Sequence, residues 1–409
     1  MTAADPFDVP HDAPFGVHNL PYGVVTTAGD PRRRLGIRFG EHVLDAGAAA
    51  AATGAPVDLL ALLAAPSLNP LLAAGRPAWS RVRAAVTAWL TEERYRAAVA
   101  PCLVPFADVV AHLPFDVADY TDFYASEHHA SNVGRIFRPD SAALPPNWKH
   151  LPIGYHGRAG TVVVSGTDVV RPCGQRRDPG EQAPSYGPSV RLDIEAEVGF
   201  VVGSPSAQGD RVALADADDH VFGLCLLNDW SARDIQAWEY VPLGPMLGKS
   251  FATSVSAWVV PLDALGHART SPPPRDPALL PYLDDSAARP SGLDLALEVG
   301  LNGHVVSRPP FATMYWTYAQ MVAHLTVNGA SLRAGDLLGS GTVSGPERDT
   351  RGALIELSWN GEEPLRLPDG TERSYLQDGD EVVISGSATG PNGSRIGLGE
   401  VRGLVRPSR

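Results

Sequence analysis

Reactive side chains are concentrated in residues 228–249, which read NDWSARDIQAWEYVPLGPMLGK. A helix beginning at Asp229, a residue type favoured as N-cap, would gather four polar side chains within an arc of roughly 60°: Asp229, Arg233, Gln236 and Tyr240. Tryptophans and other apolar residues take the remaining sides, so we expect the polar stripe to face an internal polar site. The alternative is a solvated face on which Asp229 and Arg233 form an i,i+4 ion pair.

Two further acids occur in an apolar stretch, residues 191–202, which reads RLDIEAEVGFVV. Glu195 and Glu197 are two positions apart, so on a strand both would project from one face at a spacing of ~7 Å. Two carboxylates with the same orientation would repel each other and be costly to bury, and a divalent cation between them would remove both problems. The alternative is a water-exposed face, which the following Phe200 and Val201 disfavour.

A third group of polar residues is found in residues 119–138, DYTDFYASEHHASNVGRIFR. In an extended segment Asp122 and Tyr124 point to the same side. Ser126 is a suitable N-cap for a short helix that would carry His129 in its first turn. The alternative for this segment is a polar surface loop.

Together these stretches predict a metal site with four carboxylates: Asp122, Glu195, Glu197 and Asp229. Carboxylates without clustered cysteine or histidine suit a hard cation, Ca²⁺ or Mg²⁺, rather than zinc. Four negative charges exceed the charge of one divalent ion, and Arg233 and Lys249 are the cations expected to balance the rest. Such a pocket suits the carbonyl and carboxylate groups of a small anionic oxo-acid, with His129 as the best candidate base.

The remaining pattern indicates how these residues are positioned. Residues 221–227 predict a buried strand ending at Asn228, and residues 339–345 predict a Gly- and Ser-rich turn whose backbone N–H groups can face an anion. Helices are expected at 57–63, 78–100 and 314–325, and strands at 20–25, 35–39 and 353–359. Asn302-Gly303 predicts a hairpin turn. A boundary near residues 105–118 separates an N-terminal part that carries no cluster of reactive residues.

Composition excludes several classes of function. The 409 residues include 41 Gly and 37 Pro, which favours a β-rich fold of two domains over a helical bundle. The net charge of −13 argues against nucleic acid or an anionic membrane as the main partner. Three widely spaced cysteines form no metal motif and fit a reducing compartment. With no signal peptide at the N-terminus and no membrane-length apolar run, we expect a soluble, cytoplasmic protein.

Eight motifs in order resemble the fumarylacetoacetase family: DYTDFYASEHHASNVG, NWKHLPIGYHGR, VSGT, RLDIEAEVGFVVG, NDWSARDIQAWEYVPLGPMLGKSF, LRAGDLLGSGTVSG, LIELSW and LQDGDEVVISG. The resemblance covers nearly the whole chain. It implies a mainly β fold with some α, in which an SH3-like small barrel (residues 1–115) precedes a mixed β-sandwich roll (residues 116–409), and it implies a homodimer. It further implies hydrolysis of the C–C bond of 4-fumarylacetoacetate, the last step of tyrosine and phenylalanine catabolism.

By motif position the resemblance implies roles for individual residues. The metal ligands would be the four acids above, with Lys249 and Thr253 at or near the metal shell and Asp229 shared with a second cation site. Arg233, Gln236 and Lys249 would stabilise developing negative charge. The residues implied to hold the substrate are Tyr124, Arg138, Tyr155, Gln236, Tyr240 and Thr342.

The resemblance also implies that His129 and Glu356 act together as the catalytic base. Glu356 is the one acid in an apolar segment, where an unpaired charge would be costly, and a carboxylate is the partner that orients a catalytic imidazole. The alternative is a surface histidine and a strand-edge acid.

Two other functions stay open at this stage. One is a related activity such as acylpyruvate hydrolysis, oxaloacetate decarboxylation or an isomerisation. The other is a non-catalytic, metal-stabilised binding protein, which the presence of a base and two cations disfavours.

Overall fold

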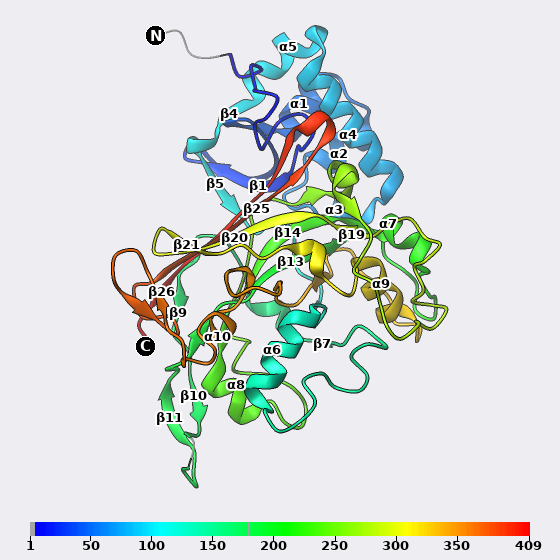
Figure 1. Ribbon diagram of the computed structural model, residues 1–409. Helices are drawn as coiled ribbons and strands as arrows, with labels where there is room; N and C mark the ends of the chain where they lie inside the picture. The colour runs from blue at the N-terminus through cyan, green and yellow to red at the C-terminus, as the bar shows by residue number, and fades with distance from the viewer. Residues whose placement is uncertain (1–4, 179) are drawn as a thin grey trace.

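The computed structural model describes residues 5–178 and 180–409 (Figure 1). Residues 1–4, the start of the segment in which no signal peptide is expected, lie outside this range. Strands outnumber helices among the described elements, as the glycine and proline content predicts. Within the described ranges, no helix combines the length and apolar character needed to cross a membrane.

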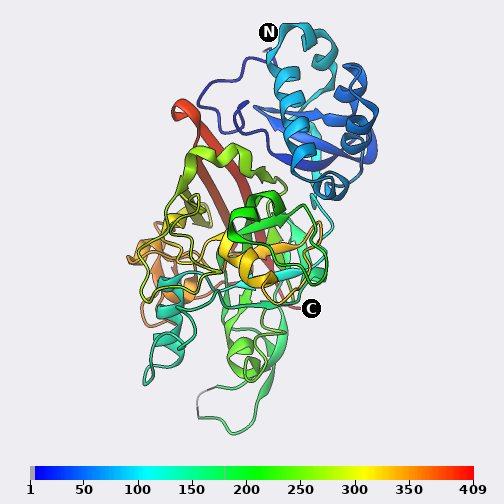
Figure 2. The ribbon, with the colours of Figure 1, turned by 90° about the vertical axis from the view of Figure 1, so that its right-hand side faces the viewer.

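The N-terminal part combines a small antiparallel sheet with a group of helices at one end of the molecule (Figures 1 and 2). Its strand order is β4-β3-β2-β1-β5. The strands are β1 (Tyr22–Thr27), β2 (Asp30–Phe39), β3 (His42–Asp45), β4 (Leu103–Pro105) and β5 (Val109–His112). The helices are α1 (Ala46–Ala52), α2 (Val57–Leu63), α3 (Asn69–Ala73), α4 (Arg76–Thr91) and α5 (Glu93–Val99). The expected helix over 57–63 is confirmed, whereas the one expected over 78–100 is two helices.

A central eight-stranded sheet carries five of the predicted site residues on its strands: Asp122, Tyr155, Glu197, Asp229 and Thr253. Its order is β7-β6-β22-β13-β14-β16-β8, with β17 also paired to β14. The strands are β6 (Tyr120–Phe123), β7 (Gly154–His156), β8 (Val162–Val164), β13 (Ala196–Val202), β14 (Val221–Asp229), β16 (Thr253–Val255), β17 (Val260–Pro261) and β22 (Leu337–Gly339).

A second sheet packs against β14, in the order β21-β20-β25-β26-β9. Its strands are β9 (Val169–Val170), β20 (Leu295–Leu301), β21 (His304–Ser307), β25 (Glu381–Thr389) and β26 (Arg395–Arg406). The hairpin turn expected at Asn302-Gly303 is confirmed between β20 and β21. The hairpin of β25 and β26 runs from this body up to the N-terminal part (Figure 1).

Shorter elements complete the fold. Two-stranded ladders join β10 (Cys173–Arg176) with β11 (Ser185–Pro188), β12 (Leu192–Asp193) with β15 (Ser231–Ala232), β18 (Arg269–Thr270) with β19 (Gly292–Leu293), and β23 (Leu365–Arg366) with β24 (Glu372–Arg373). The other helices are α6 (Glu127–Phe137), α7 (Ala217–His220), α8 (Arg233–Glu239), α9 (Tyr318–Thr326) and α10 (Leu354–Leu357). The helix expected over 314–325 thus begins later, at a Thr317 capping box.

The two faces of the central sheet belong to different cores, because successive side chains of a strand alternate sides. Val198 and Phe200 of β13 join the core shared with the second sheet. Val201 of β13 and Leu227 of β14 join a core made largely by the N-terminal part. The N-terminal part therefore buries one face of the central sheet.

The expected helix from Asp229 is wrong. Strand β14 continues to Asp229, whose N–H donates to the Glu195 carbonyl (3.1 Å), and α8 begins only at Arg233. Pairing with β13 and β16 takes up the backbone groups that a helix would need. Asp229 and Arg233 consequently come from different elements, and both are buried.

The expected strand over 353–359 is also wrong, because residues 354–357 form the helix α10. The Asp193 carboxylate accepts the backbone N–H groups of Leu354 (2.7 Å) and Ile355 (3.1 Å). A carboxylate at this position satisfies the free N–H groups of a helix N-terminus. Asp193 thereby turns the segment inward and leaves Glu356 completely buried.

Trp79 provides a test of the shared core. Its ring packs edge-on against Phe222 of β14 (centroids 5.3 Å apart), and it is buried. We expect Trp79→Ala to lower the free energy of unfolding by about 3–5 kcal/mol, the usual cost of removing a buried aromatic ring. Urea unfolding measures this loss. Tyr186→Ala, which removes an exposed ring on β11, should change stability by less than about 0.5 kcal/mol. Equal effects of the two variants would contradict a core shared by the two parts.

Candidate active site

Three of the four predicted metal ligands meet at one end of the central sheet. Asp122, Glu197 and Asp229 each have an oxygen within 4.8 Å of the others, and all three are buried. Asp122 comes from β6, Glu197 from β13 and Asp229 from the end of β14. Gly341, in the predicted turn after β22, donates its N–H to Glu197 (3.1 Å), so the anion that faces this turn is a protein carboxylate.

Glu195, the fourth predicted ligand, lies beside the cluster and is held by cations. Arg233 contacts its carboxylate at 2.8 Å, and the Lys249 ammonium also hydrogen-bonds it. Lys249 additionally donates to Asp229 at 2.7 Å. Lys249 is one of two lysines in the chain, the other being Lys149. A protonated amine has no lone pair for a metal, so the Lys249 side chain serves as a counter-ion next to the acids.

His129 and Glu356 form a buried pair. The Nδ1 atom of His129 lies 2.6 Å from Oε2 of Glu356. Asn132 (2.9 Å) and Ser344 (2.9 Å) also donate to Glu356, and Ser126 caps α6 by accepting the His129 N–H, as the sequence predicts. These contacts fix the carboxylate and present the other ring nitrogen of His129 toward Glu195, whose oxygen lies 3.7 Å away.

His129 and three of the carboxylates, Asp122, Glu195 and Glu197, border one cavity of about 330 Å³, large enough for a small diacid. Twelve of the predicted site residues line it: Asp122, Tyr124, His129, Arg138, Tyr155, Glu195, Glu197, Arg233, Gln236, Tyr240, Lys249 and Thr342. Asp229, Thr253 and Glu356 lie behind this lining and are completely buried. The sequence-predicted residues are thus brought together from strands and helices that lie far apart along the chain.

Burial and charge oppose each other in this site. Burial raises the pKa of Asp122 to about 7 despite the attraction of Arg158, and raises the pKa of Glu197 well above its usual range, with Asp122 and Asp229 adding to the effect. Burial also acts against ionisation of Glu195, but Lys249 and Arg233 outweigh it and lower its pKa. In the same way His129, Asn132 and Ser344 lower the pKa of Glu356 against its burial. The acids paired with cations are held ionised, whereas a further positive charge would be needed to keep Asp122 and Glu197 fully ionised.

The cluster fits a hard divalent cation. Oδ1 of Asp122, Oε1 of Glu197 and Oγ1 of Thr253 are buried and have no hydrogen-bond partner among the described residues. Thr253 pairs directly with Asp229 across β16 and β14. Buried oxygen atoms without partners, on strands of one sheet, are the donor set that Ca²⁺ or Mg²⁺ requires.

Sequence reasoning missed four residues of the site. Arg158, from the GYHGR motif, binds both Asp122 and Asp229, and its side chain is only 5% exposed. Asp193 anchors Arg233 (2.8 Å) as well as α10. Asn132 and Ser344 hold Glu356. Two signals were present in the sequence: Asp193 continues the two-residue period of the glutamates, and Asn132 follows His129 by three residues on one helix face.

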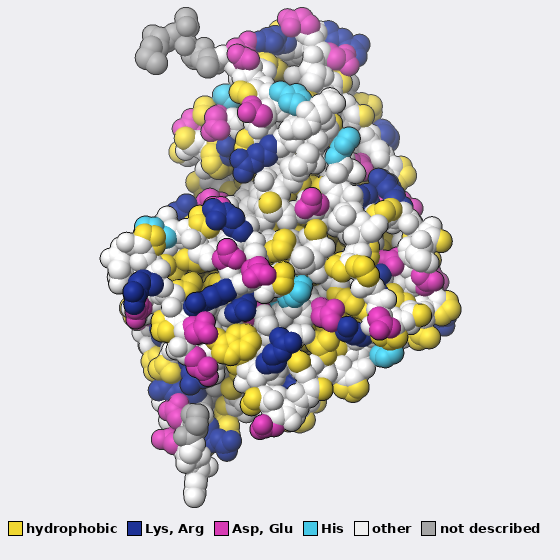
Figure 3. Space-filling view, viewed as in Figure 1, with side chains coloured by type: hydrophobic (Ala, Val, Ile, Leu, Met, Phe, Trp, Pro, Cys, Tyr) yellow, Lys and Arg dark blue, Asp and Glu magenta, His cyan; other side chains and the backbone are white. Residues whose placement is uncertain are grey.

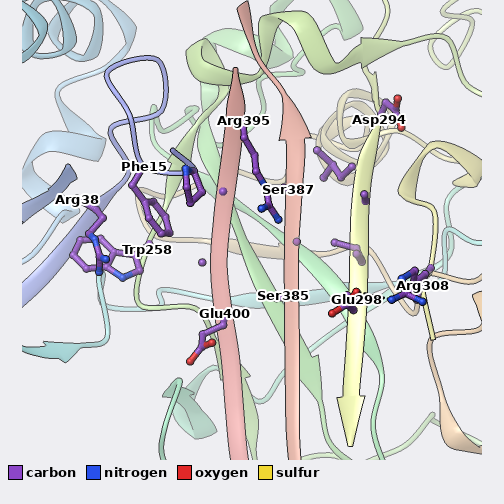
Figure 4. A pocket seen from close by; sticks show the side chains of 18 of the residues that line it. Phe15, Arg38, Trp258, Asp294, Glu298, Arg308, Ser385, Ser387, Arg395 and Glu400 are labelled. Carbon is purple, nitrogen blue, oxygen red and sulfur yellow. Dashed lines mark ion pairs between the residues drawn. The ribbon is translucent and has the colours of Figure 1, made fainter. Parts of the chain in front are cut away.

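A larger groove of about 680 Å³ lies elsewhere, between the N-terminal part and the strands β20, β25 and β26 (Figure 4). Its labelled residues include Phe15 and Arg38 on one side, Ser385 and Ser387 on the sheet, and a Glu298–Arg308 ion pair at 3.2 Å. It contains none of the predicted catalytic or metal residues. The smaller cavity is therefore the candidate active site.

Comparison with known proteins identifies the family. The chain matches family models described as "Fumarylacetoacetate (FAA) hydrolase C-terminal" over residues 119–406 and "Fumarylacetoacetase N-terminal" over residues 18–114. The chain belongs to the fumarylacetoacetase family. Its relatives include the fumarylacetoacetases of Caenorhabditis elegans (47% identical), Homo sapiens (45%) and Arabidopsis thaliana (44%), each alignment covering 98% of both chains.

Solved structures share the fold at lower identity. A fumarylacetoacetate hydrolase from Exiguobacterium antarcticum superposes with a TM-score of 0.54 at 17% identity, covering 95% of this chain and 100% of that one. Maleylpyruvate hydrolase from Sphingobium sp. SYK-6, in complex with manganese(II) and pyruvate, gives a TM-score of 0.51 at 17% identity, with coverage of 95% and 100%. These matches show that the chain shares its overall architecture with both proteins.

Glu197 tests the metal assignment. Glu197→Gln keeps the shape of the side chain and removes the charge from the least compensated carboxylate. We expect the variant to fold normally and to bind Ca²⁺ or Mg²⁺ at least about tenfold more weakly, as measured by isothermal titration calorimetry after EDTA treatment. Glu400→Gln, at an exposed acid of β26 that does not line the cavity, is the control and should bind like the wild type. Unchanged affinity in Glu197→Gln would contradict the assignment.

Proposed function

We propose that this protein hydrolyses the C–C bond of 4-fumarylacetoacetate to fumarate and acetoacetate, with His129 as the general base. The observation that carries the proposal is the buried His129–Glu356 pair at 2.6 Å, facing a cavity that also contains a carboxylate cluster and two cations. Family membership over nearly the entire chain supports the same reaction.

His129 is placed to activate water. Glu356 accepts the Nδ1–H of His129, which leaves Nε2 as the proton acceptor on the cavity side. Water is a weak nucleophile toward a ketone, so its proton must be removed as its oxygen bonds to the carbonyl carbon. Glu356 then stabilises the imidazolium that forms, as an orienting carboxylate does in other base-catalysed hydrolyses.

Bond cleavage sends an electron pair to the acetoacetate fragment. The C–C bond of the tetrahedral adduct breaks, its electrons form the enolate of acetoacetate, and the imidazolium of His129 returns the proton to that carbon. Arg233 and Lys249 carry positive charge at the cavity, and Oε1 of Gln236 accepts from Arg233 (3.1 Å), which leaves the Gln236 amide nitrogen as the donor. These groups stabilise charge that develops only during reaction.

We propose that Asp122, Glu195, Glu197 and Asp229 hold a divalent cation, Ca²⁺ or Mg²⁺, with Thr253 and Lys249 beside it. Such an ion supplies Lewis-acid polarisation of the substrate's carbonyl oxygens. The manganese and pyruvate bound by maleylpyruvate hydrolase, a protein of the same fold, support an oxo-acid next to a divalent ion. Substrate binding falls to Tyr124, Arg138, Tyr155, Tyr240 and Thr342, and the buried hydroxyls of Tyr155 and Thr342 have no partner within the described part of the chain.

We propose an SH3-like barrel in residues 1–115, a β-sandwich roll in residues 116–409, a homodimer, and a cytoplasmic location in tyrosine and phenylalanine breakdown. The partner is a small anionic diketo-acid. On the face seen in Figure 3, basic and acidic side chains are interspersed, and no broad basic area suited to nucleic acid is visible.

The variant Glu356→Gln tests whether Glu356 assists His129 as the base without contributing to metal or substrate binding. Gln keeps the volume and one acceptor but cannot stabilise an imidazolium, so we expect turnover to fall by about 10²–10⁴-fold. Metal affinity and KM should stay near wild-type values. Loss of the substrate's enolate absorbance measures the rate. The exposed Glu347→Gln serves as the control, and wild-type turnover in Glu356→Gln would rule out the proposed pair.

Lys249→Met tests charge stabilisation. Met has a similar length but no charge, so the developing enolate loses a donor and turnover should drop by about 10²–10³-fold, more than KM changes. Lys149→Met, at the other lysine, should be neutral because that side chain is 36% exposed and pairs with Glu127 at the surface. A higher KM with normal turnover would assign Lys249 to substrate binding alone.

A further inference from the structure

Arg158 connects two of the clustered carboxylates. Its Nη1 donates to both oxygens of Asp229 (2.8 and 3.0 Å), and its Nη2 donates to Asp122 at 2.7 Å. Asp229 and Asp122 belong to β14 and β6, which are separated by β13 and β22 in the sheet. A single planar guanidinium thus spans acids from two strands that are not neighbours.

The surroundings fix this guanidinium in place. It lies over the rings of Tyr120 (4.8 Å to the centroid) and Tyr155 (5.1 Å). Tyr155 in turn pairs directly with Asp122 in the β6–β7 ladder. The backbone of Arg158 is left-handed, with φ of 72°, a conformation that costs a non-glycine residue energy and is concentrated at functional sites. The chain therefore accepts local strain to aim this side chain inward.

The other two cations of the site form no ion pair with Asp122. Arg233 pairs with Asp193 and Glu195, and Lys249 with Glu195 and Asp229. Among the described residues, Arg158 is the one cation that forms an ion pair with Asp122. The bonds of Arg158 leave Oδ1 of Asp122 and Oε1 of Glu197 without partners. The guanidinium occupies one side of the cluster and leaves these oxygens available to a ligand.

We propose that Arg158 is a positioning residue that clamps Asp122 and Asp229 at the separation needed to bind a divalent cation. The inference rests on the proposed function, because it assumes that this cluster holds the ion. Three carboxylates in a buried site repel one another, and a fixed fork that binds two of them offsets that repulsion before the ion arrives. Lysine, a point charge on a flexible stem, cannot reproduce the fork.

The clamp is tested by ion affinity in EDTA-treated protein. We expect Arg158→Met to raise the Kd for Mg²⁺, Ca²⁺ and Mn²⁺ at least about tenfold in isothermal titration calorimetry. Arg158→Lys should restore less than half of the loss on a logarithmic scale, because it keeps the charge and lacks the fork. The matched control is Arg275→Met: Arg275 is also buried, binds a carboxylate (Asp285, 2.6 Å) and lies near two aromatic rings, but it does not line the cavity.

The outcomes separate the clamp from a general structural role. A double-mutant cycle with Asp122→Asn should show coupling, so that Arg158→Met weakens ion binding less in a protein that already carries Asp122→Asn than in the wild type. An Arg158→Met protein with wild-type or tighter affinity would overturn the clamp, as would full rescue by Arg158→Lys. Equal weakening by Arg275→Met would assign the loss to general destabilisation and also overturn it. A wild-type protein that hydrolyses substrate without binding any ion would instead overturn the proposed metal role.

Discussion

Uncompensated negative charge is the constraint around which this site is built. Six buried acids, Asp122, Asp193, Glu195, Glu197, Asp229 and Glu356, stand against three buried cations, Arg158, Arg233 and Lys249. Burying a carboxylate without a partner is costly, so each acid has to be matched by a cation, a set of N–H donors or a metal ion. The arrangement of arginines, helix ends and turns in this part of the molecule follows from that requirement.

The matching divides the acids into three groups with different chemistry. Asp193 takes a structural role, since it satisfies both Arg233 and the N-terminus of α10. Glu356 is held ionised by three donors and serves one histidine. Glu197 keeps an oxygen without a partner, and its charge is the least compensated. One buried site thus contains a scaffold acid, an orienting acid and a ligand acid, distinguished by their neighbours.

The sequence patterns predicted most of the residues that make up the site. They did not predict the secondary structure of two of the segments that carry them. Two-residue spacing placed Glu195 and Glu197 on one face, and capping chemistry placed His129 in the first turn of α6, because both are local properties. The helix expected at Asp229 failed since strand pairing, a long-range interaction, decided that segment. The strand expected around Glu356 failed because its cap, Asp193, lies far away in sequence. Arg158 was missed for the same reason: its partners come from distant strands.

Side chains alternate between the two faces of β13 and β14, and this alternation also affects how the chain folds during synthesis. The strand face that presents Glu197 and Asp229 also presents Val201 and Leu227 to the N-terminal core. That core also includes Leu337, so the part synthesised first cannot be completed until more than two hundred later residues have left the ribosome. Contacts of such long sequence separation form slowly and leave apolar surface exposed meanwhile. The N-terminal part therefore keeps apolar surface exposed during synthesis until the later strands that cover it have been made.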